Sequence, residues 1–178
     1  SRTRRALARC AALKPSATCA SRPSRSRTER SSGSSSPSAA PQPARLATSR
    51  DGRYIAFYSY ATNLHPDDTD GLADVYVRDL QTNTTTLVSR ATGAAGTKGN
   101  GDSLVPRISG DGRFVGFSAE ATNLVGGDTN NASDVFVRDR ATSKTTRASV
   151  DSAGVESNGD SFGPIISADG RFIVFESY

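Results

Sequence analysis

Hydrophobic and polar residues alternate in short runs along most of the chain. The runs "RFVGFSA" at 113–119 and "DVFVRD" at 134–139 are rich in β-branched and aromatic residues and end at turn residues, which predicts strands. "SKTTRASV" at 143–150 predicts a more polar outer strand, and "PRIS" at 106–109 predicts a fourth short strand. No segment shows helical apolar spacing of useful length. The pattern therefore predicts an all-β fold.

This pattern is repeated along the chain. A displacement of sixty residues places "DGRYIAFYSYATNL", which begins at Asp51, on "DGRFVGFSAEATNL", which begins at Asp111. Over the repeat, roughly half of the aligned positions are identical and no gap is needed. A displacement of fifty-eight residues places the segment 158–171 on the segment 100–113. A fixed period of this size indicates that one structural unit is stacked several times.

The turn residues suggest how one unit is built. Asp-Gly between two strand-like runs predicts a two-residue hairpin of type I′, in which both central residues have positive φ. Pro106 and Pro164 are expected at the head of the first strand of their units, where a missing N–H is harmless at a sheet edge. Four strands per unit, a proline-bearing edge strand and a period near sixty describe a β-propeller blade, with that edge lining the central channel.

The phrase "P-x-I-S-x-D-G-R-x-V-x-F-x-S", followed by a "D-V-F-V-R-D" strand, resembles the WD40-like repeat of bacterial TolB-type β-propellers, the PD40 repeat. The resemblance covers 46–178 and implies four-stranded antiparallel blades. We divide this part into a first blade at 46–102, a second at 103–160 and the start of a third at 161–178. Since closed rings have at least four blades, we expect an incomplete ring, either a fragment of a larger gene product or part of a closed oligomer.

The chain changes in composition near Arg45. Before Leu46, ten basic residues accompany one acidic residue, Glu29, whereas twelve basic residues accompany seventeen acidic ones after it. Residues 1–45 lack the apolar side chains that offset the entropy of ordering, which predicts a disordered basic tail. No aromatic residue is interleaved with its arginines to stack on bases, so specific nucleic-acid binding is not expected. No stretch of the chain is long enough to span a bilayer.

The recurring charged and aromatic residues have predicted structural roles. Strand alternation places Arg78 and Arg138 on a face that packs against a neighbouring blade, where we expect each to reach a carboxylate such as the hairpin aspartate of the adjacent unit. Phe57, Phe117 and Phe175 have one fixed offset from the Asp-Gly turns and are expected in the core between blades.

Catalysis is not expected in this part of the chain. His65 is the one imidazole of the sequence, and the next repeat has Val125 at the matching position. We therefore expect His65 on a loop surface, and we expect neither a nucleophile elbow nor a catalytic cysteine in 46–178.

An acidic loop precedes the "DVxVRD" strand in both complete units. Oxygen-bearing residues recur there at one spacing: Asp68, Asp70 and Asp74 in the first loop, and Asp128, Asn130 and Asp134 in the second. Calcium prefers such oxygen ligands at alternate positions around a turn. The spacing resembles the D-x-D-x-D-G-x-x-D calcium loop of integrin-type propellers, but Pro66 and Gly126 stand where the first ligand is expected. The other interpretation is that these residues form Asx turns leading into the strand. Calcium is the one cofactor that the sequence suggests.

The expected function is a noncatalytic scaffold that binds a protein or an extracellular polymer on a loop face or at the channel mouth. The family resemblance implies a periplasmic or extracellular location in a bacterium. Two alternatives stay open. One is a calcium-dependent binding module that uses the acidic loops, and the other is the regulatory propeller of a larger hydrolase.

Overall fold

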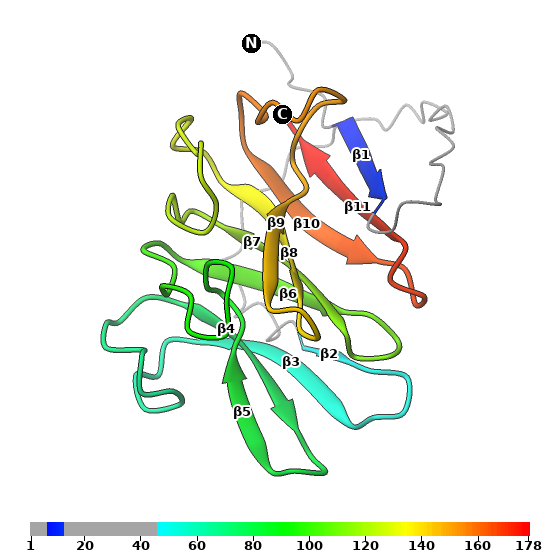
Figure 1. Ribbon diagram of the computed structural model, residues 1–178. Coiled ribbons are helices and arrows are strands. Elements are labelled where there is room, and N and C mark those ends of the chain that lie inside the picture. Colours follow the sequence, from blue (N-terminus) through cyan, green and yellow to red (C-terminus); the bar gives the residue numbers. More distant parts are fainter. Residues whose placement is uncertain (1–6, 13–45) are drawn as a thin grey trace, which may run out of the picture.

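The computed structural model describes Leu7–Ala12 and residues 46–178, and in these residues it contains strands and no helix. Three antiparallel sheets follow one another along the chain (Figure 1). The first sheet has the order β2 (Ala47–Thr48), β3 (Tyr54–Ser59), β4 (Asp74–Asp79), β5 (Thr84–Leu87). The second has the order β6 (Ser103–Ile108), β7 (Phe114–Ala119), β8 (Asp134–Asp139), β9 (Lys144–Arg147). The third has the order β1 (Leu7–Ala12), β11 (Phe172–Ser177), β10 (Ser161–Ile166).

These sheets confirm the predicted all-β fold with four-stranded antiparallel blades. Each complete sheet is a meander in which strands adjacent in sequence are neighbours in space. The inner strand of the first blade is reduced to the two residues of β2, whereas its counterparts β6 and β10 have six residues each. The three sheets form an open array of propeller blades.

The three Asp-Gly pairs turn the chain between β2 and β3, between β6 and β7 and between β10 and β11, but the predicted type I′ geometry is wrong. In the first blade, the N–H of Gly52 donates to the carbonyl of Ser49 at 3.0 Å. Gly52 has a φ of 71°, whereas Asp51 does not have a positive φ. The carboxylate of Asp51 instead accepts bonds from the Ser49 hydroxyl at 2.6 Å and the Arg53 N–H at 3.0 Å. This side chain holds a longer loop, in which the glycine adopts the left-handed conformation and the aspartate does not.

The prolines lie inside their strands and not at the head of them. β6 and β10 each begin three residues before the proline, Pro106 or Pro164, and both strands are edges of their sheets, as predicted. The residue before each proline has positive φ, 54° at Val105 and 62° at Gly163, and the pairing register shifts at this point. A β-bulge therefore interrupts the ladder where the proline lacks its N–H.

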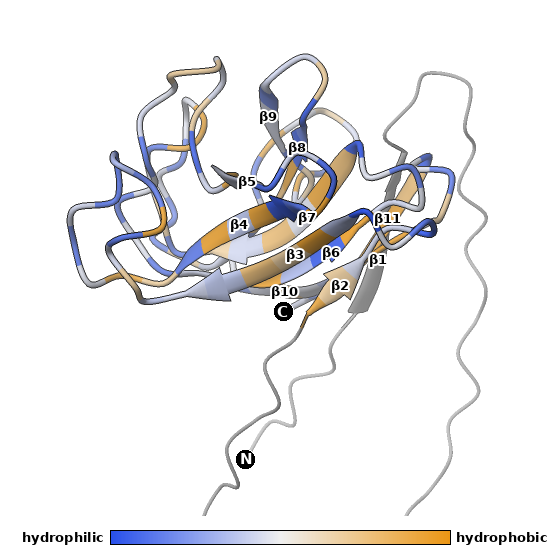
Figure 2. Ribbon diagram, turned by 90° about the horizontal axis from the view of Figure 1, so that it is seen from below, coloured by the Kyte–Doolittle hydropathy of each residue, from blue (hydrophilic) through white to orange (hydrophobic). Residues whose placement is uncertain are grey.

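The apolar core lies between the blades. One cluster joins the first two sheets, and its members include Ala56, Val75, Val77, Val115, Phe117 and Phe136. A second cluster joins the next two sheets and includes Phe114, Val135, Val137, Ile173 and Phe175. Figure 2 shows the apolar residues gathered on the strands and the polar residues on the connecting loops. Each large apolar side chain buried in this way stabilises the fold by about 1.5–3 kcal/mol.

The three phenylalanines at the fixed offset do not all lie in this core. Phe117 and Phe175 lie in the clusters between blades, as predicted. Phe57 is half-buried and belongs to neither cluster. It lies on the face of β3 opposite to Ala56 and stacks on Tyr76, with 5.6 Å between ring centroids.

β1 lies within the segment predicted to be disordered. It pairs antiparallel with β11 over six residues, from Leu7 opposite Ser177 to Ala12 opposite Phe172 (Figure 1). The predicted disorder is therefore wrong for Leu7–Ala12, because the edge of β11 offers unpaired backbone groups that a strand can satisfy whatever its side chains. The rest of the predicted tail, residues 1–6 and 13–45, lies outside the described residues.

Candidate functional site

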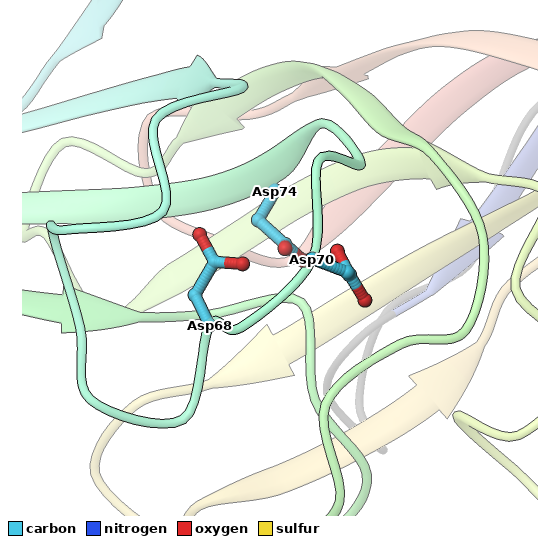
Figure 3. Close-up of side chains that lie close together, drawn as sticks. All are labelled: Asp68, Asp70 and Asp74. Carbon is cyan, nitrogen blue, oxygen red and sulfur yellow. The ribbon is translucent and has the colours of Figure 1, made fainter.

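The first acidic loop, between β3 and β4, brings together the three residues that its sequence singled out. One carboxylate oxygen from each of Asp68, Asp70 and Asp74 lies within 4.8 Å of the others. Figure 3 shows the carboxylate of Asp68 directed toward those of Asp70 and Asp74. Asp68 is 2% exposed and Asp74 is fully buried, whereas Asp70 is exposed. Three carboxylates so close together need a compensating positive charge.

Lys98 supplies a positive charge inside this cluster. Its Nζ lies 3.0 Å from Oδ1 of Asp70 and 2.6 Å from Oδ2 of Asp74, and its side chain is almost entirely buried. Burial raises the pKa of Asp74, while hydrogen bonds from Lys98 and Ser89 act in the opposite direction. The acidic group is thus neutralised in part by the chain itself.

The carboxylate oxygens of Asp70 and Asp68 differ in their hydrogen bonds: one forms a turn, and another has no partner. Oδ1 of Asp70 accepts a bond from the N–H of Leu72 at 3.0 Å, which is the Asx turn that the sequence also predicted. The hydroxyl of Tyr76 donates to Oδ2 of Asp68. The second oxygen of Asp68, Oδ1, is buried and has no hydrogen-bond partner. A buried carboxylate oxygen without a partner costs stability unless a cation or water satisfies it.

The second acidic loop, between β7 and β8, brings Glu156 beside two of the residues predicted there. Asp128, Asp134 and Glu156 have carboxylate oxygens within 4.8 Å of one another. Nδ2 of Asn130 donates to the carbonyl of Ser157 at 2.6 Å, and its Oδ1 accepts from the N–H of Ala132 at 2.8 Å, in the same Asx turn that Asp70 forms in the first loop. The role of Asn130 as a metal ligand stays a prediction. Glu156 was missed, although the displacement of fifty-eight residues places it on Lys98.

Arg147 neutralises the second group as Lys98 neutralises the first. Its Nη1 lies 2.6 Å from Glu156 and 3.1 Å from Asp134, and 3.6 Å from Oδ1 of Asp128. Burial, and then the neighbouring carboxylate of Asp134, raise the pKa of Asp128. The position of Arg147 is Leu87 in the first repeat. Each carboxylate group thus has a buried cation of its own, and the two come from different places, since Lys98 lies in the loop after β5 and Arg147 ends β9.

Arg138 fastens the second blade to the first, but not through the predicted carboxylate. Its Nη1 donates to the carbonyl of Ala91 at 2.8 Å and its Nη2 donates to the carbonyl of Gly93 at 2.8 Å. Both carbonyls belong to the loop that follows β5. Among the described residues, Arg78, the equivalent residue of the first blade, bonds within its own blade, to Thr85 at 3.1 Å and to Asn83. The prediction of a carboxylate partner is wrong for both arginines, since unpaired loop carbonyls or nearby side-chain oxygens serve instead.

The aspartate that follows each of these arginines pairs with the arginine of the Asp-Gly-Arg turn. Arg53 donates to both carboxylate oxygens of Asp79, at 3.0 and 2.7 Å. Arg113 does the same with Asp139, at 2.9 and 2.7 Å. These bidentate bonds lower the pKa of Asp79 and lower that of Asp139 to about 2. The "DGR" and "VRD" phrases therefore recur together, because the arginine of the first binds the aspartate of the second within one blade.

The residues that resemble catalytic groups have structural environments. His65 lies in the first acidic loop, where its Nδ1 accepts a bond from the N–H of Asp67 at 3.2 Å. The sequence motif of a nucleophile elbow, Gly-x-Ser-x-Gly, was not expected but does occur, since the segment 159–163 reads Gly-Asp-Ser-Phe-Gly. Its serine, Ser161, begins β10, is fully buried and shares a 3.1 Å bond with the hydroxyl of Ser177. A nucleophile elbow instead exposes its serine between a strand and a helix.

Comparisons with known proteins show a similarity in fold to solved β-propeller structures. No family model and no curated protein sequence matches the chain. The structure is similar to TolB from Acinetobacter baumannii, at 19% identity and a TM-score of 0.44 over 72% of this chain and 25% of that protein. It is similar to a TolB of Agrobacterium tumefaciens, at 22% identity and a TM-score of 0.49 over 77% of this chain and 39% of that one. It is also similar to the tricorn protease, at 18% identity and a TM-score of 0.45 over 75% of this chain and 11% of that protein.

The chain thus spans between about a tenth and two fifths of the length of these proteins. TolB is the family that the repeat resembles in sequence. Within Leu7–Ala12 and residues 46–178 there is no helix long and apolar enough to cross a membrane.

Proposed function

We propose that this chain is part of a noncatalytic β-propeller scaffold that binds another protein outside the cytoplasm of a bacterium. One observation carries the proposal, an exposed apolar face on the third sheet. Its large side chains are Phe162, Ile165, Val174 and Tyr178. Ile165 is 61% exposed and pairs directly with Val174, and the ring of Phe162 contacts that of Tyr178 with 6.4 Å between centroids. The exposed carboxylate of Glu176 lies on the same face, between Val174 and Tyr178 along the strand and opposite Phe162. An exposed surface that is apolar in most of its side chains is typical of an interaction site.

The two preceding blades suggest what covers this face. In the second blade the position equivalent to Val174 is Gly116, and a Cβ placed there would lie 3.0 Å from Cδ1 of Ile173 in the third blade. The corresponding face of each earlier blade is therefore packed against the next sheet. The partner that best fits the exposed face is a protein sheet with β-branched and aromatic residues, and not a hydrophilic polymer. The location outside the cytoplasm rests on the family resemblance of the repeat.

Light scattering coupled to gel filtration tests this use of the face in the full chain. We expect the wild-type mass to increase with concentration, because the face can pack against the sheet of a second copy when no other partner is present. The double variant Ile165→Lys with Val174→Lys should stay monomeric. Leu80→Lys, at an exposed apolar residue in the turn after β4, is the matched control and should leave association unchanged. A wild-type chain that stays monomeric at every concentration would argue against the proposal.

A calcium-dependent binding module is the second candidate function. It is favoured by Oδ1 of Asp68, which is buried, lacks a hydrogen-bond partner and lies beside two further carboxylates. The first loop fits a hard cation better than the second, because a lysine can leave the cluster more readily than the arginine, which holds three acidic groups and the carbonyl of Gly127. In this function Asp68, Asp70 and Asp74 hold the ion, and Lys98 moves toward solvent.

Thermal melts in calcium and in EDTA separate the two candidates. Calcium bound by the folded chain alone raises the melting temperature. If the loop binds calcium, Asp68→Asn should abolish that rise. A melting temperature that is equal in both solutions would leave the aspartates as turn formers.

A further inference from the structure

A cavity of about 240 Å³ lies between the first and second blades. Its lining residues come from the end of β5, from the loop 90–98 that follows β5, and from β8 and the turn after it. The polar residues that matter here are Arg90, Arg138, Arg140 and Ser143. Of the described residues that line the cavity, three are arginines and none is acidic. The cavity is therefore strongly basic.

Arg138 brings a buried charge to this cavity. The residue is 5% exposed, and its Nη1 and Nη2 donate to carbonyls of the loop 90–98 and to the hydroxyl of Thr145. In the part of the chain that the structure describes, no carboxylate forms an ion pair with it, and the adjacent Asp139 binds Arg113 instead. Uncharged oxygens solvate a guanidinium but do not neutralise it, and a buried charge without a counter-charge lowers stability.

The first blade shows a side chain that reaches the equivalent arginine. There, Nη2 of Arg78 donates to Oδ1 of Asn83 in the turn between β4 and β5. The displacement of sixty residues places Asn83 on Ser143, and the two residues have nearly the same φ, 58° and 57°. The shorter side chain of Ser143 lines the cavity and forms no hydrogen bond with Arg138. An amide group would stand at this place if the second blade copied the first.

The other two arginines of the cavity are not features of the repeat. Arg140 has Leu80 as its counterpart in the first repeat, and that leucine is exposed. Arg90 has Val150 as its counterpart in the second repeat. The packing of one blade on the next consequently does not require either arginine. Their presence in one cavity with Arg138 is specific to the boundary between the first two blades.

The charges of these two arginines are balanced to different extents. Nη2 of Arg90 lies 2.7 Å from Oδ2 of Asp67, so a carboxylate neutralises this arginine. The guanidinium of Arg140 lies over the ring of Tyr54, 4.3 Å from the ring centroid, and forms no ion pair with a carboxylate of residues 46–178. The cavity thus holds two guanidinium groups, those of Arg138 and Arg140, that lack a paired carboxylate there.

From this excess of positive charge we propose that the cavity is a binding site for a small oxyanion of the phosphate and sulfate class. Guanidinium groups bind such oxyanions through short, charge-assisted hydrogen bonds, often two at a time. The bound ion supplies the counter-charge that Arg138 lacks. Pockets for drug-sized organic ligands have about 300–1,000 Å³, so the smaller volume here favours an inorganic ion. The site goes beyond the scaffold function and does not depend on the apolar face of the third sheet.

Isothermal titration calorimetry of the full chain with inorganic phosphate tests the site at constant ionic strength. We expect one phosphate ion per chain, displaced by sulfate but not by an equal concentration of chloride. Arg140→Gln should weaken phosphate binding about tenfold, because it removes one of the two unpaired charges. Arg50→Gln, at an exposed arginine that does not line the cavity, is the control and should change the affinity by less than about twofold. A wild-type chain that binds no phosphate, or equal losses in the two variants, would overturn the proposal.

Ser143→Asp tests the same site by placing a carboxylate in it. Aspartate and asparagine both tolerate positive φ, so Ser143→Asn is the matched variant without the charge. In buffer without phosphate, the aspartate variant should melt about 2–4 °C above the asparagine variant, because its carboxylate pairs with Arg138. It should bind phosphate at least about tenfold more weakly than the asparagine variant, because like charges repel. Equal phosphate affinities of the two variants, or a lower melting temperature of the aspartate variant, would contradict an oxyanion site.

Discussion

Arg138 on β8 donates a 2.8 Å hydrogen bond from Nη2 to the carbonyl of Gly93, in the loop that follows the preceding blade. The guanidinium is buried, and burial lowers its pKa. An arginine stays charged under these conditions, so the loop carbonyls must solvate it in place of water. The loop and the strand consequently determine each other's position.

Arg138→Ala should destabilise the full chain by about 2–3 kcal/mol, because it leaves buried carbonyls without a donor. Arg78→Ala is the matched control, since the equivalent arginine is half-buried and its hydrogen bonds to described residues stay within its own blade. We expect the control to cost about 1 kcal/mol or less. Urea unfolding with an unchanged m-value measures both. Equal losses for the two variants would show that the contact between blades contributes nothing.

Acid should weaken the fold through the Arg113–Asp139 pair. The bonds from Arg113 hold the pKa of Asp139 at about 2 in the folded state, below the value near 3.9 of an unfolded aspartate. The stability from this pair is therefore complete above about pH 4 and is lost as the pH falls toward 2. Asp79 acts in the same direction.

Asp139→Asn removes that contribution, so the free energy of unfolding of the variant should depend less on pH between 4 and 2 than that of the wild type. The comparison must be made between the two proteins, because the raised pKa values of Asp74 and Asp128 act with the opposite sign. Parallel pH profiles from urea unfolding would contradict the assigned role of the pair.

Lys98→Met tests whether the first acidic loop exchanges its internal cation for calcium. Without calcium, the variant should melt at a lower temperature than the wild type, since the carboxylates around Lys98 lose their counter-charge. With calcium, the increase in melting temperature should be larger than in the wild type, because the ion no longer competes with the ammonium group. Lys144→Met, at an exposed lysine on β9, is the control. Calcium shifts of the same size in all three proteins would argue against a metal site.

Gly112→Ala should be more destabilising than Gly52→Ala, although the two glycines have nearly the same φ, 73° and 71°. Both alanines carry the cost of a left-handed backbone, about 1 kcal/mol. A Cβ at Gly112 would also lie 2.2 Å from Cδ2 of Tyr54 in the preceding blade, whereas the space around Gly52 is open. The difference should reach about 1–3 kcal/mol in urea unfolding. Equal costs would show that Tyr54 moves aside freely.

Strand positions followed from the sequence because the β-branched and aromatic residues of "FVGF" and "DVFV" fill the space between blades. The bulge at Val105 was not predictable, since valine disfavours positive φ and gives no sign of a bulge. The partners of Arg138 are backbone carbonyls, which leave no trace in the residue pattern. Glu156 lies far along the chain from the aspartates that it joins, so only the fold reveals the contact. β1 pairs with β11 through its backbone, and amino-acid composition does not predict such pairing.

The loop 90–98 has a consequence for how the chain folds. It is encoded at the end of the first blade and has bonds of its own, such as that from the N–H of Ala91 to the carbonyl of Thr97, but Arg138 and Thr145 of the second blade donate further hydrogen bonds to its carbonyls. During synthesis the loop therefore gains these further contacts only after β8 and β9 have left the ribosome. Each blade then gains stability only when its successor forms, as in other arrays with nearest-neighbour coupling. We expect the blades to unfold in one cooperative transition, and the loop to be the first target of proteolysis in a chain whose synthesis has stopped before Thr145.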